Sequence, residues 1–278
     1  MTASVLRLPT GLRQAVVHSS VRFTPSRIAS SCPVSRSYAT AYTASPTSSV
    51  NHTEVSHFNA LASSWWDPHG SSRLLHLMNP LRHDFLHRCL APEVRDPNQK
   101  LNFLDIGCGG GIFAESAARL AMAESVTAID PTPETSIEDL HMHSDRKQYD
   151  IISLFEVIEH IQRPFPFLTA SVLPYLKPGG WLIGSTIARH PVSWFTTIFM
   201  AEDVLGLVPR GTHDWSQYLQ PQEVRDWARR EPDLSTSEGL GWHVQGVVYV
   251  PGVGWKPVNG SEVYGNYFFG VKKREDLS

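Results

Sequence analysis

The stretch LNFLDIGCGGG, residues 101–111, decides the fold of this 278-residue chain. Its apolar start predicts a buried strand, and its glycines predict a tight turn directly after the strand. Because glycine has no side chain, such a turn lets backbone N–H groups approach a small ligand closely. The spacing excludes two common sites. Counted from Gly107, a dinucleotide fingerprint needs glycine at the sixth position, which is Ile112, and the chain has no GKS or GKT of a phosphate-binding loop.

Two carboxylates next to this turn indicate the ligand. Asp105 ends the first strand, and Asp130 closes the next predicted strand, SVTAID. Asp130 would accept the hydroxyls of a ribose, and Gly107 and Gly109 would let the backbone pass under an amino-acid group. S-adenosylmethionine carries an amine and a ribose diol in this arrangement. Alternatively, the glycines serve only the packing of the turn. A single glycine would fit that interpretation, whereas four glycines beside two carboxylates favour a ligand site.

Strand and helix patterns alternate through the middle of the chain, which predicts an α/β fold with a mainly parallel sheet. Two apolar stretches near the C-terminus flank a Gly/Pro turn and predict an antiparallel hairpin. The patterns are typical of helix at 74–90, 111–121 and 164–176, of strand at 101–107, 125–130, 149–156 and 181–187, and of the hairpin at 241–250 and 263–273.

Several motifs carry a family resemblance. WWDPHG at 65–70, NPLR at 79–82 and PRGTHDW at 209–215 are specific in this order, and LDIGCGGG, EVIEH, LKPGG and NYFF accompany them. The chain resembles the ubiquinone-biosynthesis O-methyltransferase family in its mitochondrial branch. The resemblance implies a class I S-adenosylmethionine-dependent methyltransferase domain, Rossmann-like, over residues 51–278. It also implies methylation of catechol-type hydroxyls on a polyprenylated ring, at two steps of ubiquinone synthesis.

The pentad EVIEH is the candidate for chemistry at the acceptor. If it opens a helix, Glu156, Glu159 and His160 are spaced to lie on one side of a turn. Such donors can hold a divalent cation, and Mg²⁺ suits oxygen-rich ligands and would favour the ionised catechol; the resemblance implies Mg²⁺ as well. We name Glu156 and His160 as candidate catalytic residues, with His160 as general base in the competing interpretation. Alternatively, the acids only stabilise a helix N-terminus.

Two further candidates belong to the cofactor. Arg82 in NPLR would bind the carboxylate of S-adenosylmethionine, as the resemblance implies; otherwise it is a surface arginine on a helix. Phe155 precedes EVIEH and is expected to contact the adenosine. The predicted cofactor-binding set is therefore Arg82, Asp105, Gly107, Gly109, Asp130 and Phe155.

An apolar insert at 188–212 follows the fourth predicted strand and includes Trp194, Phe195 and Phe199. It is too short, with Glu202 and Asp203 too central, to span a bilayer. A segment that lies in the membrane interface fits a polyprenylated substrate. The alternative from the pattern is an insert that covers the core.

The N-terminal segment differs in composition from the rest. Residues 1–53 contain five arginines and many serines but no Asp, Glu or Lys. This composition is typical of a mitochondrial transit peptide, which we assign to 1–45. The expected location is the matrix side of the inner membrane, as a peripheral protein in contact with lipid. A net charge of −3 gives no indication of nucleic-acid binding.

The segment between Asp130 and Tyr149 has only 18 residues. A full fold of this class places a helix, a strand and two connections there, which do not fit comfortably. We therefore expect one edge strand and its helix to be missing, with weaker binding of the adenine. The expected partners are other ubiquinone-synthesis enzymes in a complex. The alternative function is a non-catalytic, structural member of that complex.

Overall fold

The structure of the protein is a computed structural model that describes residues 65–67, 69–70, 72–92, 96, 98–130, 147–204 and 214–275. The predicted transit peptide over 1–45 lies outside these residues, and so do most of the short segment at 131–148 and the end of the apolar insert.

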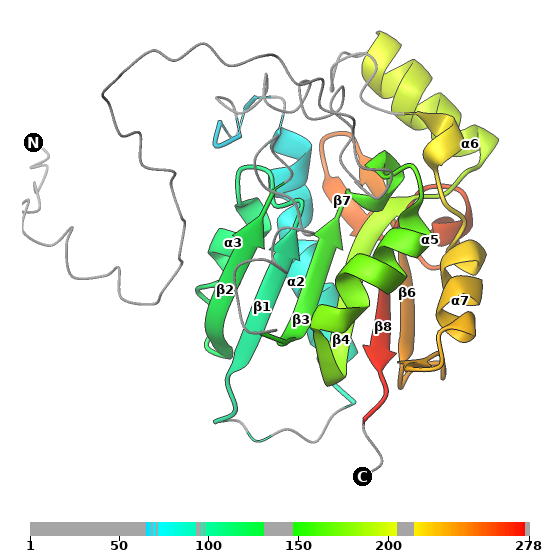
Figure 1. The fold of residues 1–278 in the computed structure, drawn as a ribbon. Helices are drawn as coiled ribbons and strands as arrows, with labels where there is room; N and C mark the ends of the chain where they lie inside the picture. The colour runs from blue at the N-terminus through cyan, green and yellow to red at the C-terminus, as the bar shows by residue number, and fades with distance from the viewer. Residues whose placement is uncertain are drawn as a thin grey trace, which may run out of the picture.

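A mixed sheet forms the centre of the molecule (Figure 1), with the strand order β2-β1-β3-β4-β8-β6-β7 and with β5 paired to β8. The first four strands pair in parallel, and β8, β6 and β7 continue the sheet in antiparallel pairs. The α/β prediction and the C-terminal antiparallel pairing are confirmed. The strands are β1 (Leu101–Ile106), β2 (Ala123–Ile129), β3 (Tyr149–Phe155), β4 (Leu176–Ile187), β5 (Leu234–Ser235), β6 (Trp242–Val250), β7 (Gly254–Pro257) and β8 (Asn266–Lys273).

Two details of the sheet differ from the prediction. In sequence, the short strand β7 comes between the two arms of the predicted hairpin. In the sheet, it pairs with β6 at the end of the strand order. The predicted strand at 181–187 begins later than β4, which starts at Leu176 and includes the KPGG of residues 177–180. The register explains this, because Tyr149 pairs with Leu176 whereas Ile151 pairs with Trp181. The residues between Leu176 and Trp181 therefore bulge out of the ladder, as a turn would.

Helices cover both faces of the sheet, and Figure 1 shows α2 and α5 on opposite sides. One apolar core joins α2 and α3 to the sheet, and the other joins the α5–η6 segment and α7 to it. The helical elements are α2 (Arg73–Leu90), α3 (Ile112–Ala117), η4 (Ile158–His160), α5 (Pro164–Phe167), η5 (Leu168–Val172), η6 (Leu173–Tyr175), α6 (Pro191–Ser193), η7 (Trp194–Val204), η8 (Trp215–Gln217), α7 (Pro221–Arg230) and η9 (Ser261–Val263).

The two cores follow from the alternation of side chains along each strand. Phe103 packs toward α2 and α3, and its neighbour Leu104 packs toward the α5 and α7 side. Phe268 and Phe269 of β8 divide in the same way. Because both faces of the sheet are buried, the central strands are mostly apolar. A polar residue inside one of them therefore indicates a specific partner or role.

In the described part of the chain, β2 stands at one end of the sheet order and pairs with β1. The strand and helix that we expect to be missing would lie beyond β2. Because residues 131–146 are outside the described ranges, the loss of these elements stays a prediction.

Candidate cofactor site

The candidate site lies where β1 and β3 end, at the carboxyl edge of the parallel strands. The chain leaves β1 toward β2 on one side and returns as β3 on the other, so this edge is a topological switch point, where α/β sheets bind ligands. Both strands end in left-handed backbone, at Gly107 with φ 68° and at Glu156 with φ 58°. Among the described residues Glu156 is the only non-glycine with positive φ. Such a conformation costs about 1–3 kcal/mol and is typical of functional sites.

Ser185 of β4 holds Glu156 in this conformation. The backbone N–H of Glu156 donates to the Ser185 carbonyl at 3.2 Å and to its Oγ at 3.0 Å. The Ser185 hydroxyl in turn donates to Oε1 of Glu156 at 2.6 Å. These contacts turn the Glu156 carboxylate back toward the sheet, and they supply the free energy that the strained backbone requires.

Arg82 is buried, and its charge interacts with those of two carboxylates. Arg82 is 4% exposed, and its guanidinium lies over the Phe155 ring, 4.9 Å from the ring centroid. Burial lowers the pKa of Arg82, and the charges of Glu156 and Asp105 act in the opposite direction. Within the described structure its Nε has no hydrogen-bond partner. Arg82 is therefore not the surface arginine of the alternative interpretation, and it keeps a buried donor for another acceptor.

Asp105 is also buried. The Ser153 hydroxyl donates to its Oδ1 at 2.6 Å. Burial raises the pKa of Asp105 to about 6, although the bond from Ser153 and the charge of Arg82 both lower it. A carboxyl group with this pKa is poised to ionise when a cationic group, such as an ammonium, comes next to it.

The glycine turn connects the ends of β1 and β2. The N–H groups of Gly107 and Cys108 donate to the Ile129 carbonyl at 2.8 and 3.1 Å. Gly109 N–H donates to Oδ1 of Asp130 at 3.2 Å. Burial raises the pKa of Asp130, and the bond from Gly109 opposes this shift. The structure thus gathers the whole predicted cofactor-binding set along one edge of three neighbouring strands.

The pentad EVIEH does not form the helical turn that the spacing predicted. Only Ile158–His160 is helical, as the single 3₁₀ turn η4, and the left-handed Glu156 lies before it. Glu159 points into the interior and is 4% exposed. No three His, Cys, Asp or Glu side chains of the described residues group as metal ligands. The predicted geometry of the Glu156, Glu159 and His160 set is therefore wrong, because the strand ends in a kink rather than in a helix.

Burial dominates the electrostatics of Glu159. Burial, together with the nearby charge of Glu156, raises the pKa of this carboxyl group to about 7. The imidazole of His160 acts in the opposite direction. The three groups are thus coupled electrostatically, although they do not converge on one point.

Sequence reasoning missed three residues of the site. Ser153 and Ser185 are polar residues near the ends of otherwise apolar strands, and this was the signal that could have found them. Trp65, the first residue of the motif WWDPHG, lies in a turn, and its indole covers Gly109 and Gly110. A Cβ on Gly109 would stand 2.7 Å from Cη2 of Trp65, so glycine is needed there.

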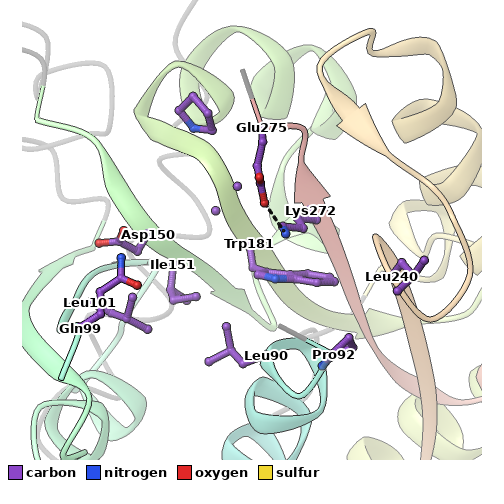
Figure 2. Close-up of a pocket in the computed structure, with 13 residues that line it drawn as sticks. Leu90, Pro92, Gln99, Leu101, Asp150, Ile151, Trp181, Leu240, Lys272 and Glu275 are labelled. Carbon is purple, nitrogen blue, oxygen red and sulfur yellow. Dashed lines mark hydrogen bonds and ion pairs between the residues drawn. The ribbon is translucent and has the colours of Figure 1, made fainter. Parts of the chain in front are cut away.

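A cavity of about 440 Å³ opens at the opposite, amino-terminal edge of β1 and β3 (Figure 2). Its charged groups are paired: Lys177 Nζ lies 2.9 Å from Oδ2 of Asp150, and Lys272 Nζ lies 3.2 Å from Oε1 of Glu275. None of the candidate residues lines this cavity. It is therefore separate from the candidate cofactor site.

Comparison with known proteins defines the class first. Residues 74–231 match a methyltransferase domain family. The solved plantazolicin methyltransferase BpumL, in complex with SAH, shares the fold with a TM-score of 0.51 at 19% identity, over 80% of this chain and 97% of its own. The related BamL gives a TM-score of 0.53 at 14% identity, over 80% and 99%. The protein is a class I methyltransferase in fold.

Curated relatives then define the family. A mitochondrial ubiquinone biosynthesis O-methyltransferase of Candida albicans is 36% identical over 81% of this chain and 86% of its own. The one of Saccharomyces cerevisiae is 32% identical, over 79% and 87%. A bacterial one from Cereibacter sphaeroides is 38% identical, over 67% and 84%. The chain belongs to the ubiquinone biosynthesis O-methyltransferase family, and the resemblance and O-methyltransferase activity that its motifs predicted are confirmed.

The pKa of Asp105 predicts a pH dependence of stability. Because the pKa is about 6 in the folded chain and 3.8 ordinarily, the protonated carboxyl group stabilises the fold below about pH 4, and this contribution is lost as the pH rises to about 6. The loss amounts to about 3 kcal/mol for this shift. We expect Asp105→Asn, which stays neutral, to flatten the free energy of unfolding between pH 4 and pH 6 in denaturant titrations.

The half-exposed Asp226 supplies the control, because Asp226→Asn removes a carboxylate that pairs with Arg229 at the surface. It should leave the pH profile unchanged. A profile of Asp105→Asn that is parallel to that of the wild type would show that folding does not raise the pKa of Asp105.

Proposed function

We propose that this chain transfers the methyl group of S-adenosylmethionine to catechol-type hydroxyls of polyprenylated ring intermediates, at two steps of ubiquinone synthesis. The observation that carries the proposal is the buried pair of Arg82 and Asp105, with the half-buried Glu156 near Arg82, beside a glycine-rich turn at the switch point of the sheet. Membership of the O-methyltransferase family supports the reaction type. The polyprenylated substrate is part of our proposal and goes beyond the reaction type.

The chain's own groups fit the cofactor. The unpartnered Nε of the buried Arg82 suits the cofactor carboxylate, since a charge-assisted bond to a buried donor is a strong one. Asp105 suits the ammonium, which would lower its raised pKa. Asp130 would exchange its bond from Gly109 for the ribose hydroxyls. When bound, S-adenosylmethionine supplies an activated methyl group.

The acceptor hydroxyl must lose its proton during transfer, and His160 or Glu156 would take it. His160 follows the kinked end of β3, and its imidazole interacts with the buried Glu159 carboxyl group. Glu156 is held by Ser185 and shares the charge of Arg82. A carboxylate that is already satisfied in this way is a weaker base, so we favour His160 as the general base.

Magnesium stays a separate hypothesis. Glu156, Glu159 and His160 do not fit a metal centre in the described conformation, because they do not converge. We therefore derive no step through Mg²⁺. If the ion takes part, either these side chains rearrange or the substrate oxygens complete its ligands.

Methyl transfer to a short-prenyl catechol analogue tests the function. We expect His160→Ala to lower kcat by about 10²–10⁴-fold, as the loss of a general base does, with the affinity for S-adenosylmethionine nearly unchanged in calorimetry. The exposed His87→Ala is the matched control and should keep full activity. Full activity of His160→Ala would exclude His160 as the base. A chelator arm tests magnesium independently, since unchanged activity in excess chelator contradicts Mg²⁺ dependence.

The short segment between Asp130 and Tyr149 supports the second candidate, a non-catalytic member of a ubiquinone-synthesis complex. A missing adenine wall of roughly 100 Å² would forfeit about 2.5 kcal/mol of apolar burial and weaken binding nearly a hundredfold. The same calorimetry separates the two candidates. No binding of S-adenosylmethionine together with co-purification of other pathway enzymes would favour the structural role.

The described part of the apolar insert at 188–212 supports the proposal that the protein associates with a membrane. The helix formed by α6 and η7 is anchored on its inner side, where Thr197 Oγ1 and the Tyr218 hydroxyl are hydrogen-bonded at 2.7 Å. On its outer side Trp194, Phe195 and Phe199 are 45%, 48% and 41% exposed. Of the helices in the described ranges, none is long and apolar enough to cross a membrane. An anchored helix with exposed aromatic side chains suits a peripheral, interfacial position.

Replacing Trp194, Phe195 and Phe199 with Ser should therefore lower co-sedimentation with anionic liposomes by about tenfold or more, because aromatic burial in the interface is lost. The midpoint of thermal unfolding should hardly change. Leu240→Ser with Val253→Ser, at two positions that are 65% and 61% exposed elsewhere, is the control. Unchanged co-sedimentation with a lower midpoint would instead assign these aromatics to the folded core.

The location in the cell extends this proposal. The yeast relatives are mitochondrial, and the acid-free N-terminal composition agrees with import. We place the chain on the matrix side of the inner membrane, within a complex of ubiquinone-synthesis enzymes. Protease protection of the tagged chain in isolated mitochondria, before and after rupture of the inner membrane, checks this placement; cleavage in intact mitochondria would contradict it.

A further inference from the structure

The paired tryptophans at the start of the described chain have different environments. Trp65 lies on the glycine turn: its ring atom Cη2 lies 2.7 Å from the position of a Cβ on Gly109, and its own side chain also fills the corresponding position at Gly110. Trp66, one residue later, is 54% exposed. Because Gly109 and Gly110 have no side chains, the indole of Trp65 packs directly against their backbone.

The backbone that carries Trp65 is fastened to α2. The Trp65 carbonyl accepts a hydrogen bond from Nε2 of His76 at 2.8 Å. Asp67 then closes the connection to α2, since its carbonyl accepts from Gly70 N–H at 3.0 Å. The same helix carries Arg82. The residue that carries the indole is therefore hydrogen-bonded to the helix that carries the guanidinium.

From this arrangement we propose that Trp65 is a wall of the cofactor site, with its indole held over the glycine turn to contact the amino-acid end of S-adenosylmethionine. The inference rests on the proposed function. An indole offers a large, rigid apolar surface at low cost in conformational entropy, and its face attracts cations. The amino-acid end of this cofactor adjoins a positively charged sulfonium, which such a face suits.

Calorimetric titration with S-adenosylmethionine tests the proposal on the full chain. We expect Trp65→Ala to weaken binding about tenfold, the ordinary effect of losing an aromatic contact, and Trp65→Phe to stay within about threefold of the wild type. Trp66→Ala is the matched control and should bind as the wild type does.

Fluorescence separates direct contact from a structural role. S-adenosylmethionine should change the tryptophan emission of the wild type and of Trp66→Phe, and most of this change should be absent in Trp65→Phe. A variant that merely loosens the fold would have a lower unfolding midpoint but would keep the change.

The outcomes are distinct. If the wild type does not bind S-adenosylmethionine, the proposed function fails and the inference fails with it. If the wild type binds and Trp65→Ala binds equally or more tightly, the inference alone is wrong, and the indole only packs against the turn or obstructs it. Retention of the full emission change in Trp65→Phe would also contradict direct contact.

Discussion

The burial of the Arg82 guanidinium is the constraint on which the rest of the site depends. A charge removed from water costs several kcal/mol unless opposite charges surround it. Asp105 at the end of β1 and Glu156 after β3 provide these charges, and the Phe155 ring packs beneath. The arrangement requires α2, β1 and β3 to meet at one edge of the sheet. It also agrees with the hydrogen bonds that Ser153 and Ser185, polar residues in largely apolar strands, donate to the two carboxylates.

This constraint joins the fold to the chemistry. A buried arginine that interacts electrostatically with two carboxylates and keeps an unpartnered donor is prepared for a ligand that carries both an anionic and a cationic group. An amino-acid moiety is such a ligand, and the glycine turn with its covering Trp65 lies next to it. The structure therefore brings the residues proposed for the cofactor together around the carboxyl ends of the parallel strands.

The sequence predicted the parallel strands and the edge at which the candidate residues gather, because apolar periodicity and the glycines that end a strand are local signals. It did not predict the left-handed Glu156, because the spacing of EVIEH suits a helix and the bonds from Ser185 come from a distant strand. The position of Trp65 also depends on contacts distant in sequence, with Gly109 and His76. Composition and local spacing do not predict contacts between residues that are far apart in sequence. The glycines that accommodate Trp65 can, however, be recognised in the sequence.

The affinity of Arg82→Lys for S-adenosylmethionine tests the central claim most directly. Lysine keeps the positive charge that Asp105 and Glu156 require, but it lacks the planar, multiple donors of arginine. If Arg82 binds the cofactor carboxylate, calorimetry should show binding at least about tenfold weaker than that of the wild type, with an unchanged midpoint of thermal unfolding. Equal affinity of the two proteins would contradict the account, because Arg82 would then serve only the internal charge balance.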